Sequence, residues 1–367
     1  METGTMVAKP EAMQAKKHYE ILDGLRGVAA VMVVIFHFME VVFTDPSTNF
    51  AGHGFLAVDF FFCLSGFVIA YAYDNRMATM STGRFFLQRL IRLHPLVVLG
   101  AVMALVLYLV DPIVPPFAAY GVGSVVLIFL TSILLIPYPV MEERYFNLFS
   151  LNAPSWSLFW EYVANIVYAL VLWRLPRRIM VVLTLLAAGG ISYVAYTAGN
   201  VVGGWSGGTF WHGFARVAYS FPAGILVYRY RMIIPNKLGF PGLTVLLLAA
   251  LMMPYFQYNW LVELGIVLLY FPLLIALGAG ATLAPALKPL CNFSGHISYP
   301  LYMTHYGAIW IFANYFNTYK PGTTELTMVI VSGVLILIAV AYMAMRWFDV
   351  PVRQYLSKKI LKKVIKY

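Results

Sequence analysis

The sequence is poor in charge and in cysteine. Charged residues make up 11 % of its 367 residues, whereas a soluble domain carries about 25 %. Cys63 and Cys291 lie in or beside apolar runs, where small buried hydrophobic residues are expected. Residues 1–20 contain no apolar stretch that would predict a cleaved signal peptide. This pattern excludes an ordinary soluble enzyme, a disordered protein and a disulfide scaffold.

Hydrophobic residues, by contrast, make up 61 % of the chain. Since a helix needs about 20 mostly apolar residues to cross a bilayer, the composition predicts an all-α polytopic membrane protein. Apolar segments of helical length are residues 27–43, 54–73, 93–111, 122–138, 155–173, 179–197, 210–228, 242–257, 260–279, 295–316 and 326–348. We expect one membrane domain at 21–350, between an N-terminal segment at 1–20 and a basic tail at 351–367.

The positions of lysine and arginine predict the topology. Basic residues gather between apolar segments and at both ends of the chain, which is typical of cytoplasmic loops. The net charge of +10 therefore indicates anionic lipid rather than nucleic acid as the partner. Basic residues near the ends include Lys9, Lys16, Lys17, Arg26, Lys358, Lys359, Lys362, Lys363 and Lys366. Both termini are accordingly expected in the cytoplasm.

If every basic loop is cytoplasmic, the crossings can be counted from either end of the chain. The two counts disagree by one crossing between residues 112 and 154. This region contains the helix-breaking residues Pro115, Pro116, Pro137, Pro139 and Pro154, together with Gly121 and Gly123. Irregular backbone at membrane depth is tolerated where it is buried in protein or lines a wet cavity. We therefore predict about ten transmembrane helices plus a re-entrant segment; the alternative is that one loop violates the charge rule.

The first apolar segment carries a face of ionisable residues. At about 100° per residue, Arg26 and His37 lie on one side of a helix, and Asp23 lies close to the same side. A charged group inside a span costs about 2.5–3.5 kcal/mol, so each one is a functional candidate. We interpret His37, near mid-membrane, as a general base or an acyl carrier. A neutral core histidine that bonds another helix is the alternative.

The second apolar segment contains Asp59 among aromatic residues, followed by Ser65 and Gly66. Asp59 is predicted to pair with His37 and fix its tautomer, as a carboxylate does in a catalytic triad. A structural polar pair between helices is the other interpretation. For Ser65 and Gly66 we favour close helix packing.

Three arginines begin the next segment. Arg89 and Arg92 share a helix face, three residues apart, and Arg84 precedes them. Paired guanidinium groups suit phosphate recognition. The same arginines also satisfy the bias for basic cytoplasmic loops.

Two further segments carry polar stripes at helical spacing. The first comprises Ser157, Glu161, Asn165 and Tyr168, and the second comprises Ser298, Tyr302 and His305. Such stripes should face the bundle interior or a wet cavity. Glu161 is predicted to position Arg26 or His37, or to act as an acid. A structural hydrogen-bond ladder is the alternative, and His53 is interpreted as an unremarkable loop-edge residue.

With these residues assembled, the chain resembles the membrane-bound acyltransferase family 3 over nearly its whole length. The resemblance rests on residues 22–27 (LDGLRG) with His37 eleven positions after Arg26, on 54–67, on 89–95, on 155–158 with Glu161, and on 298–305. One departure is Asp349, where glutamate is expected before the terminal proline.

The resemblance implies ten spans and an enzyme that moves an acyl group, often acetyl, from acyl-CoA to a carbohydrate, glycolipid or other hydroxyl acceptor. We expect no permanently bound cofactor and no metal, and a bacterial cytoplasmic membrane as the location. Expected catalytic residues are His37, Arg26, Asp59 and Glu161; expected donor-binding residues are Arg89, Arg92, Ser65 and Asp23; expected acceptor-binding residues are Trp156, Ser157, Tyr302 and His305. The runner-up is a transporter of a sugar or an anionic metabolite, although no matching halves are visible.

Overall fold

The computed structural model describes residues 18–117 and 119–361. Within that part of the chain the secondary structure is helical, apart from two isolated β-bridges. The α-helices are α1 (Glu20–Val42), α2 (Ala57–Tyr73), α3 (Thr82–Leu109), α4 (Val122–Ile133), α5 (Ser155–Leu170), α6 (Arg177–Ala198), α7 (Phe210–Arg229), α8 (Gly239–Leu251), α9 (Asn259–Gly265), α10 (Phe271–Gly280), α11 (Lys288–Thr304), α12 (Tyr306–Tyr319), α13 (Thr323–Met343) and α14 (Val350–Leu356). The predicted roles of Lys9, Lys16, Lys17, Lys362, Lys363 and Lys366 fall outside the described residues.

Every apolar segment of the sequence overlaps at least one helix. Length and apolar composition make six helical stretches of the described chain long enough to cross a membrane. These stretches are Glu20–Val42, Gly54–Tyr73, Thr82–Leu109, Arg177–Ala198, Asn259–Gly280 and Thr323–Ile360. The apolar helices α4 and α8 are shorter, and α5 has 16 residues. The chain therefore has the make-up of a multi-pass membrane protein.

Several helix boundaries differ from the sequence-based segments, three of them for a clear local reason. The helix predicted from residue 93 begins at Thr82, because Ser81 Oγ caps the backbone N–H of Arg84 at 3.3 Å. The segment 122–138 is helical to Ile133 and then turns through the left-handed residue Leu135 before two prolines. The segment 242–257 is helical to Leu251, just ahead of Pro254.

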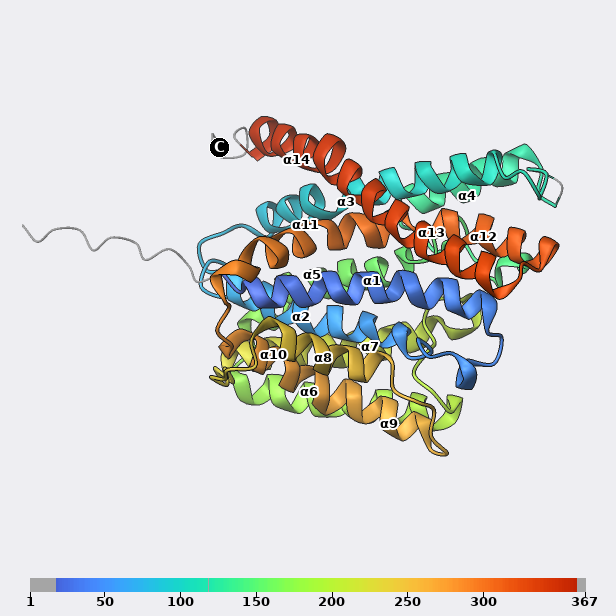
Figure 1. The fold of residues 1–367 in the computed structure, drawn as a ribbon. Coiled ribbons are helices and arrows are strands. Elements are labelled where there is room, and N and C mark those ends of the chain that lie inside the picture. Colours follow the sequence, from blue (N-terminus) through green and yellow to red (C-terminus); the bar gives the residue numbers. More distant parts are fainter. Residues whose placement is uncertain (1–17, 118, 362–367) are drawn as a thin grey trace, which may run out of the picture.

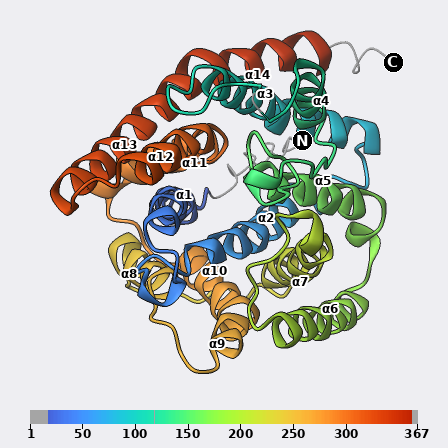
Figure 2. The same cartoon turned by 90° about the vertical axis from the view of Figure 1, so that its right-hand side faces the viewer.

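The helices pack side by side, and α2 lies at the centre of the bundle (Figures 1 and 2). Two helix pairs approach closely, α1 with α11 and α2 with α7. A side chain at Gly66 would overlap the carbonyl oxygen of Phe221, and one at Gly224 would overlap that of Cys63. The close packing predicted for Gly66 is confirmed, and it brings the backbones of α2 and α7 together.

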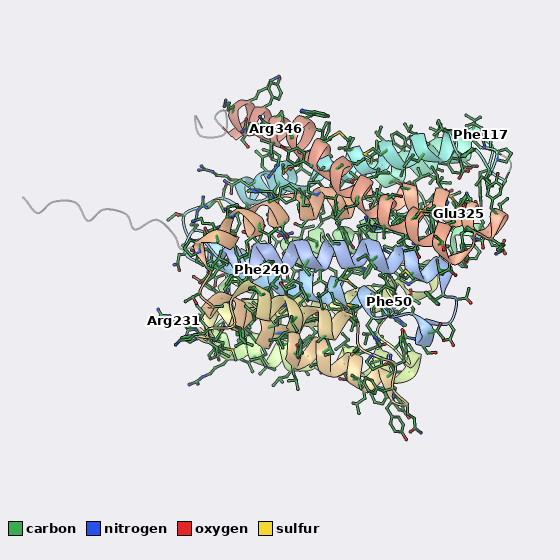
Figure 3. The ribbon with its side chains drawn as sticks, in the orientation of Figure 1. Phe50, Phe117, Arg231, Phe240, Glu325 and Arg346 are labelled. Atoms are coloured by element: carbon green, nitrogen blue, oxygen red, sulfur yellow. The ribbon has the colours of Figure 1, made fainter. Side chains whose placement is uncertain are left out.

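The two ends of the bundle are distinguished by the chain termini. Helix α1 begins and α14 ends at the same end, which we call the terminal end; the opposite end is the distal end (Figure 1). Arg231 and Arg346 lie toward the terminal end, whereas Glu325 and Phe117 lie at the distal end (Figure 3). Arg26 is thus near the terminal end of α1, and His37 is nearer its distal end.

The proline-rich region around α4 returns to the place where it starts. The Tyr120 hydroxyl, just before α4, donates to the Glu143 carboxylate at 2.7 Å and accepts the backbone N–H of Glu142 at 3.1 Å. Between these contacts, Ile128 of α4 packs against Ala104 of α3. The short helix therefore belongs to an excursion whose two ends meet beside each other.

Candidate active site

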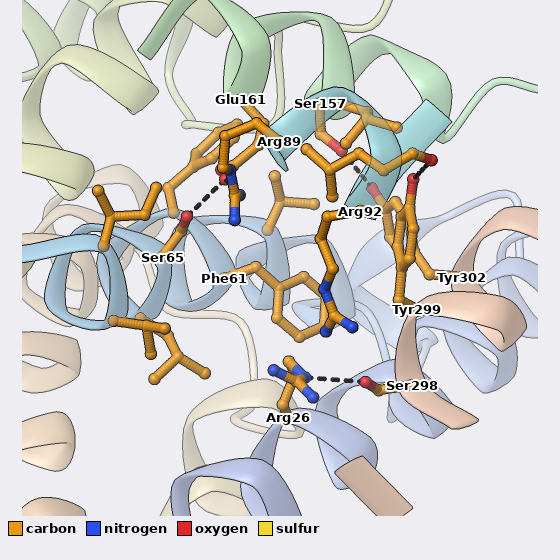
Figure 4. A pocket seen from close by; sticks show the side chains of 17 residues that line it. Arg26, Phe61, Ser65, Arg89, Arg92, Ser157, Glu161, Ser298, Tyr299 and Tyr302 are labelled. Atoms are coloured by element: carbon orange, nitrogen blue, oxygen red, sulfur yellow. Dashed lines mark hydrogen bonds and ion pairs between the residues drawn. The ribbon is translucent and has the colours of Figure 1, made fainter. Parts of the chain in front are cut away.

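A cavity of about 210 Å³ lies among α1, α2, α3, α5 and α11 (Figure 4). Residues from every predicted motif line it. Its polar lining consists of Arg26, Ser65, Arg89, Arg92, Ser157, Glu161, Ser298, Tyr299 and Tyr302, and aromatic and aliphatic side chains such as Phe61, Phe62 and Leu158 complete the wall. The structure thus brings most of the predicted site residues to one hollow.

A second cavity of about 330 Å³ adjoins the first, because the two share Val68, Ile69, Arg89 and Arg92. Its remaining lining includes Tyr73 at the end of α2, Gln88, and Ser357 beyond α14. Those elements end at the terminal end of the bundle, so the two cavities together extend from that end toward the interior.

Arg26 is held in place by three partners. Its guanidinium pairs with Asp23 at 3.1 Å and donates to the Gly295 carbonyl at 2.7 Å. Nε of Arg26 donates to the Ser298 hydroxyl at 2.9 Å (Figure 4). Asp23 is not among the cavity-lining residues, so it orients Arg26 from behind.

Glu161 anchors the opposite wall. One of its oxygens accepts from the Ser65 hydroxyl at 2.5 Å and from Arg89 Nη2 at 3.1 Å. Asn165 adds a longer contact at 3.4 Å. The predicted contacts of Glu161 with Arg26 or His37 are therefore replaced by contacts with Arg89 and Ser65 (Figure 4).

Arg92 differs from the other two arginines. Its side chain is exposed to the cavity space, and within the described residues no hydrogen bond or ion pair engages it. Asp23 and Glu161 partly neutralise Arg26 and Arg89, so Arg92 leaves the cavity with a surplus positive charge. A cavity of this kind can bind an anion such as a phosphate.

At the inner end of the cavity, Ser157 and Tyr302 form a hydrogen bond of 2.7 Å. The Ser157 hydroxyl already donates to the Pro154 carbonyl at 3.0 Å, so Tyr302 is the donor to Ser157. The Tyr302 ring also meets the ring of Phe61 edge to face, at 5.7 Å between centroids. These two rings close the cavity on the side of the histidines.

His37 lies beyond that wall, and it does not line the cavity. Its Nδ1 is 2.5 Å from Glu40 Oε1, so the carboxylate favours a proton on Nδ1 and leaves Nε2 as the basic atom. The rings of His37 and His305 stack at 5.3 Å between centroids. His305 in turn lies 6.1 Å from the ring of Tyr302, which connects the histidine pair to the cavity wall.

His305 is fully buried, and its tautomer follows from its contacts. Nδ1 lies 2.9 Å from the Leu301 carbonyl, which can only accept a hydrogen bond, so Nδ1 carries the proton. Nε2 is then a lone-pair acceptor, and it has no partner in the described chain. Helix α11 ends at Thr304 and α12 begins at Tyr306, while His305 between them keeps helical backbone angles, so its ring stays near Tyr302 of the predicted stripe.

The predicted pairing of Asp59 with His37 is wrong. The Asp59 carboxylate instead forms a two-pronged ion pair with Arg216 of α7, at 2.6 and 3.1 Å, and both side chains are fully buried. Arg216 also donates to the carbonyls of Phe55, Val202 and Gly203. Trp156 covers this guanidinium at 5.1 Å and does not line the cavity.

His53 is also placed differently from the sequence-based interpretation. It is fully buried, with Nδ1 at 2.9 Å from the Met253 carbonyl and Nε2 at 3.1 Å from Asn259 Oδ1. Glu263 lies 3.6 Å from Nε2 and is itself buried. His53 therefore joins its own loop to the loop between α8 and α9 and to the start of α9.

Sequence reasoning missed three charged residues that the structure makes prominent, Arg216, Glu40 and Arg144. Arg216 lies inside an apolar segment, so its charge alone should have marked it. Glu40 follows His37 by three residues, the spacing of neighbours on a helix face. Arg144 lies in the proline-rich region, where no periodic pattern exists to place it.

Comparison with known proteins adds two matches. The model of a family described as an acyltransferase domain matches residues 19–346. A protein of Rhizobium radiobacter named "Protein 2 in picA locus" is 39 % identical over 162 residues, which cover 42 % of this chain and 82 % of that protein. No solved structure matches the chain.

Proposed function

The chain belongs to the acyltransferase family whose model spans residues 19–346, and on this basis we propose that it transfers an acyl group, such as acetyl, from acyl-CoA to a hydroxyl of a carbohydrate or related acceptor. Acyl-CoA is proposed as the donor because its phosphates fit a positively charged cavity in which Arg92 has no partner among the described residues. Family membership does not favour the transporter alternative.

The donor enters, in this proposal, from the terminal end. Its phosphates bind Arg92 and the partly neutralised Arg89, and the apolar wall of the inner cavity receives the pantetheine arm. Arg26, fixed by Asp23 and Ser298, adds a third positive charge on the opposite side. The thioester then points toward Tyr302 and the histidine pair.

His37 is the proposed base. With Nδ1 bound to Glu40, Nε2 takes the proton of the acceptor hydroxyl while that oxygen attacks the thioester carbonyl. The carbon–sulfur bond then breaks, and the CoA sulfur leaves and takes up a proton. Because Tyr302 and Phe61 separate the cavity from His37, we infer that the Tyr302 ring rotates when the donor binds.

The proposed topology has about ten crossings with α4 as a re-entrant segment, both termini in the cytoplasm, and a bacterial inner membrane as the location. The contact of Tyr120 with Glu143 supports the re-entrant path, since the chain leaves and returns at one place. The basic residues at the terminal end support its cytoplasmic position (Figure 3). Donor and acceptor would then approach from opposite sides of the membrane.

Calorimetric titration of acetyl-CoA into the purified protein in detergent tests the donor site. The double variant Arg89→Gln with Arg92→Gln should weaken binding by about 10-fold to 100-fold, since a charge-assisted hydrogen bond contributes about 1.5–3 kcal/mol. Arg178→Gln, an exposed arginine remote from the cavity, is the matched control. Unchanged binding by the double variant would refute this donor site, and no binding of any acyl-CoA by the wild type would refute the proposed donor.

A further inference from the structure

Arg144 is a buried cation at the distal end that the proposed reaction does not yet use. It closes the turn Glu142–Arg144, and its side chain is 8 % exposed. The guanidinium lies between the rings of Tyr108 and Trp310, at 5.2 and 4.8 Å from their centroids. Its hydrogen bond to protein runs from Nη1 to the Ser150 carbonyl at 2.7 Å.

No carboxylate of the described chain forms an ion pair with Arg144. The nearby Glu143 accepts a hydrogen bond from Tyr120, and Asp111 is engaged by Asn314 and by two backbone N–H groups. Burial lowers the pKa of Arg144 from its usual range. The side chain therefore bears the cost of burying a charge without a counter-ion.

Most of the hydrogen-bond donors of Arg144 are unused in the part of the chain that the structure describes. A guanidinium has five N–H groups in a planar fork, and one of them is used. Within the described residues, no hydrogen bond or ion pair engages the other two nitrogens of Arg144. Nε1 of Trp310 is buried as well and lacks a partner in the described chain.

Arg144 is connected to the histidine pair by a short series of ring contacts. The Tyr306 ring meets His37 at 5.0 Å and Trp310 at 6.3 Å between centroids. Trp310 then covers Arg144. Tyr306 and Trp310 thus link His37 to Arg144, so both residues belong to one polar and aromatic cluster.

The backbone at Arg144 is held in a costly conformation. Tyr145 and Phe146, which follow it directly, both have left-handed φ angles, of 56° and 51°. Neither residue is glycine, and such strain persists where the surroundings enforce it, often at ligand sites. The turn thus fixes the guanidinium between its two rings.

We propose that Arg144 binds an anionic group of the acceptor, a carboxylate or a phosphate, and that the acceptor is an anionic sugar such as a uronic acid or a sugar phosphate. This inference rests on the proposed function, because it places the acceptor beside His37. The anion supplies the missing counter-charge, and the planar fork of arginine pairs with its two oxygens.

Tryptophan fluorescence of the purified protein in dodecyl maltoside, without acyl donor, tests the site. The probes are methyl β-D-glucuronide and glucose 1-phosphate, with methyl β-D-glucoside as the neutral counterpart. The wild type should bind the anionic probes at least about 10-fold more tightly than the neutral one. No preference for the anionic probes, or no binding of any probe, would overturn the proposal.

Variants locate the effect. Arg144→Gln should abolish the preference for the anionic probes. Arg144→Lys keeps the charge and should retain part of that preference. The lysine variant therefore distinguishes loss of the anion site from a folding defect in Arg144→Gln. Arg174→Gln is the matched control, since Arg174 covers Trp173 at the same 4.8 Å but is exposed. A preference retained in Arg144→Gln, or lost in Arg92→Gln instead, would also overturn the proposal.

Repeating the titration with dioleoylphosphatidylglycerol separates an acceptor anion from a lipid headgroup. Unchanged probe binding supports a soluble anionic acceptor at Arg144, whereas displacement of the probe by lipid would overturn the acceptor assignment in favour of a headgroup. Because no acyl donor is present, failure here leaves the acetyl-CoA titration as a separate test of the proposed function.

Discussion

The ionisable residues near the two ends of α1 differ in their partners. Near the terminal end, Arg26 is fixed by Asp23 and Ser298 beside a cavity in which Arg92 has no described partner. Near the distal end, His37 is bound to Glu40 and stacked on His305. The first arrangement suits a mobile anion that arrives and leaves, whereas the second holds a base in one orientation.

A buried ion pair shows what a satisfied charge looks like in the same fold. Arg216 donates hydrogen bonds to Asp59 and to three backbone carbonyls, and its side chain is buried. Arg92 has the same chemistry but none of these partners. The contrast separates a structural arginine from one that is available to a ligand.

The largest expected effect comes from removing the proposed base. His37→Ala should lower the rate of acyl transfer by about 10²-fold to 10⁴-fold, the usual contribution of general acid–base catalysis, while the protein still elutes as a folded species. Single-turnover transfer from radiolabelled acetyl-CoA measures this rate. His296→Ala is the control, since His296 is exposed; equal rates for wild type and His37→Ala would remove His37 from the mechanism.

Breaking the pair of Asp59 and Arg216 should instead lower stability. Asp59→Ala leaves Arg216 buried without its counter-ion, at a cost of about 3–5 kcal/mol. Thermal denaturation in detergent measures the loss, and the double variant Asp59→Leu with Arg216→Met should recover much of it. A double variant that is as stable as wild type but inactive would restore Asp59 to the catalytic residues or add Arg216 to them.

A smaller effect is expected at Glu40, which orients His37. Glu40→Gln removes a charge-assisted hydrogen bond of about 1.5–3 kcal/mol and should lower kcat about 10-fold to 100-fold. KM for acetyl-CoA should stay unchanged, because Glu40 lies away from the cavity. Glu40→Asp should recover part of kcat; a change confined to KM would contradict the positioning role.

The smallest effect on activity and stability is expected at Tyr302, which lies between the donor cavity and the histidine pair. Tyr302→Phe removes the hydrogen bond to Ser157 but keeps the ring, so activity and stability should change by about 1 kcal/mol, or roughly five-fold in rate. Steady-state kinetics and thermal denaturation of the same sample measure both. Complete loss of activity would show that the hydroxyl itself takes part in the chemistry.

The sequence predicted which residues matter better than it predicted their partners. Charges inside apolar runs stand out, so Arg26, Arg89 and Glu161 could be placed at a polar site, and helical spacing put Arg89 and Arg92 on one face. Partners on other helices are different: Asp59 and Arg216 are 157 residues apart in the chain. Periodicity shows which face of a helix is buried, but not which helix packs against that face.

The same limit explains the histidines. Helical spacing put His305 on the face of Ser298 and Tyr302, but it could not show that the ring of His37, on another helix, stacks against His305. For residues 112–154, prolines and charge predict a re-entrant segment, and that path stays a prediction. The strained turn that holds Arg144 could not be predicted, since it depends on contacts with α3 and α12.

The central claim is that the two regions divide the work, one binding the donor and the other performing the transfer. The most direct test is the release of CoA from acetyl-CoA at increasing donor concentration, in Arg92→Gln and His37→Ala. We predict that Arg92→Gln raises the half-saturating concentration about 10-fold and leaves the maximal rate intact, whereas His37→Ala does the reverse, with the rate lost and half-saturation unchanged. Both variants changing the same parameter would contradict the division.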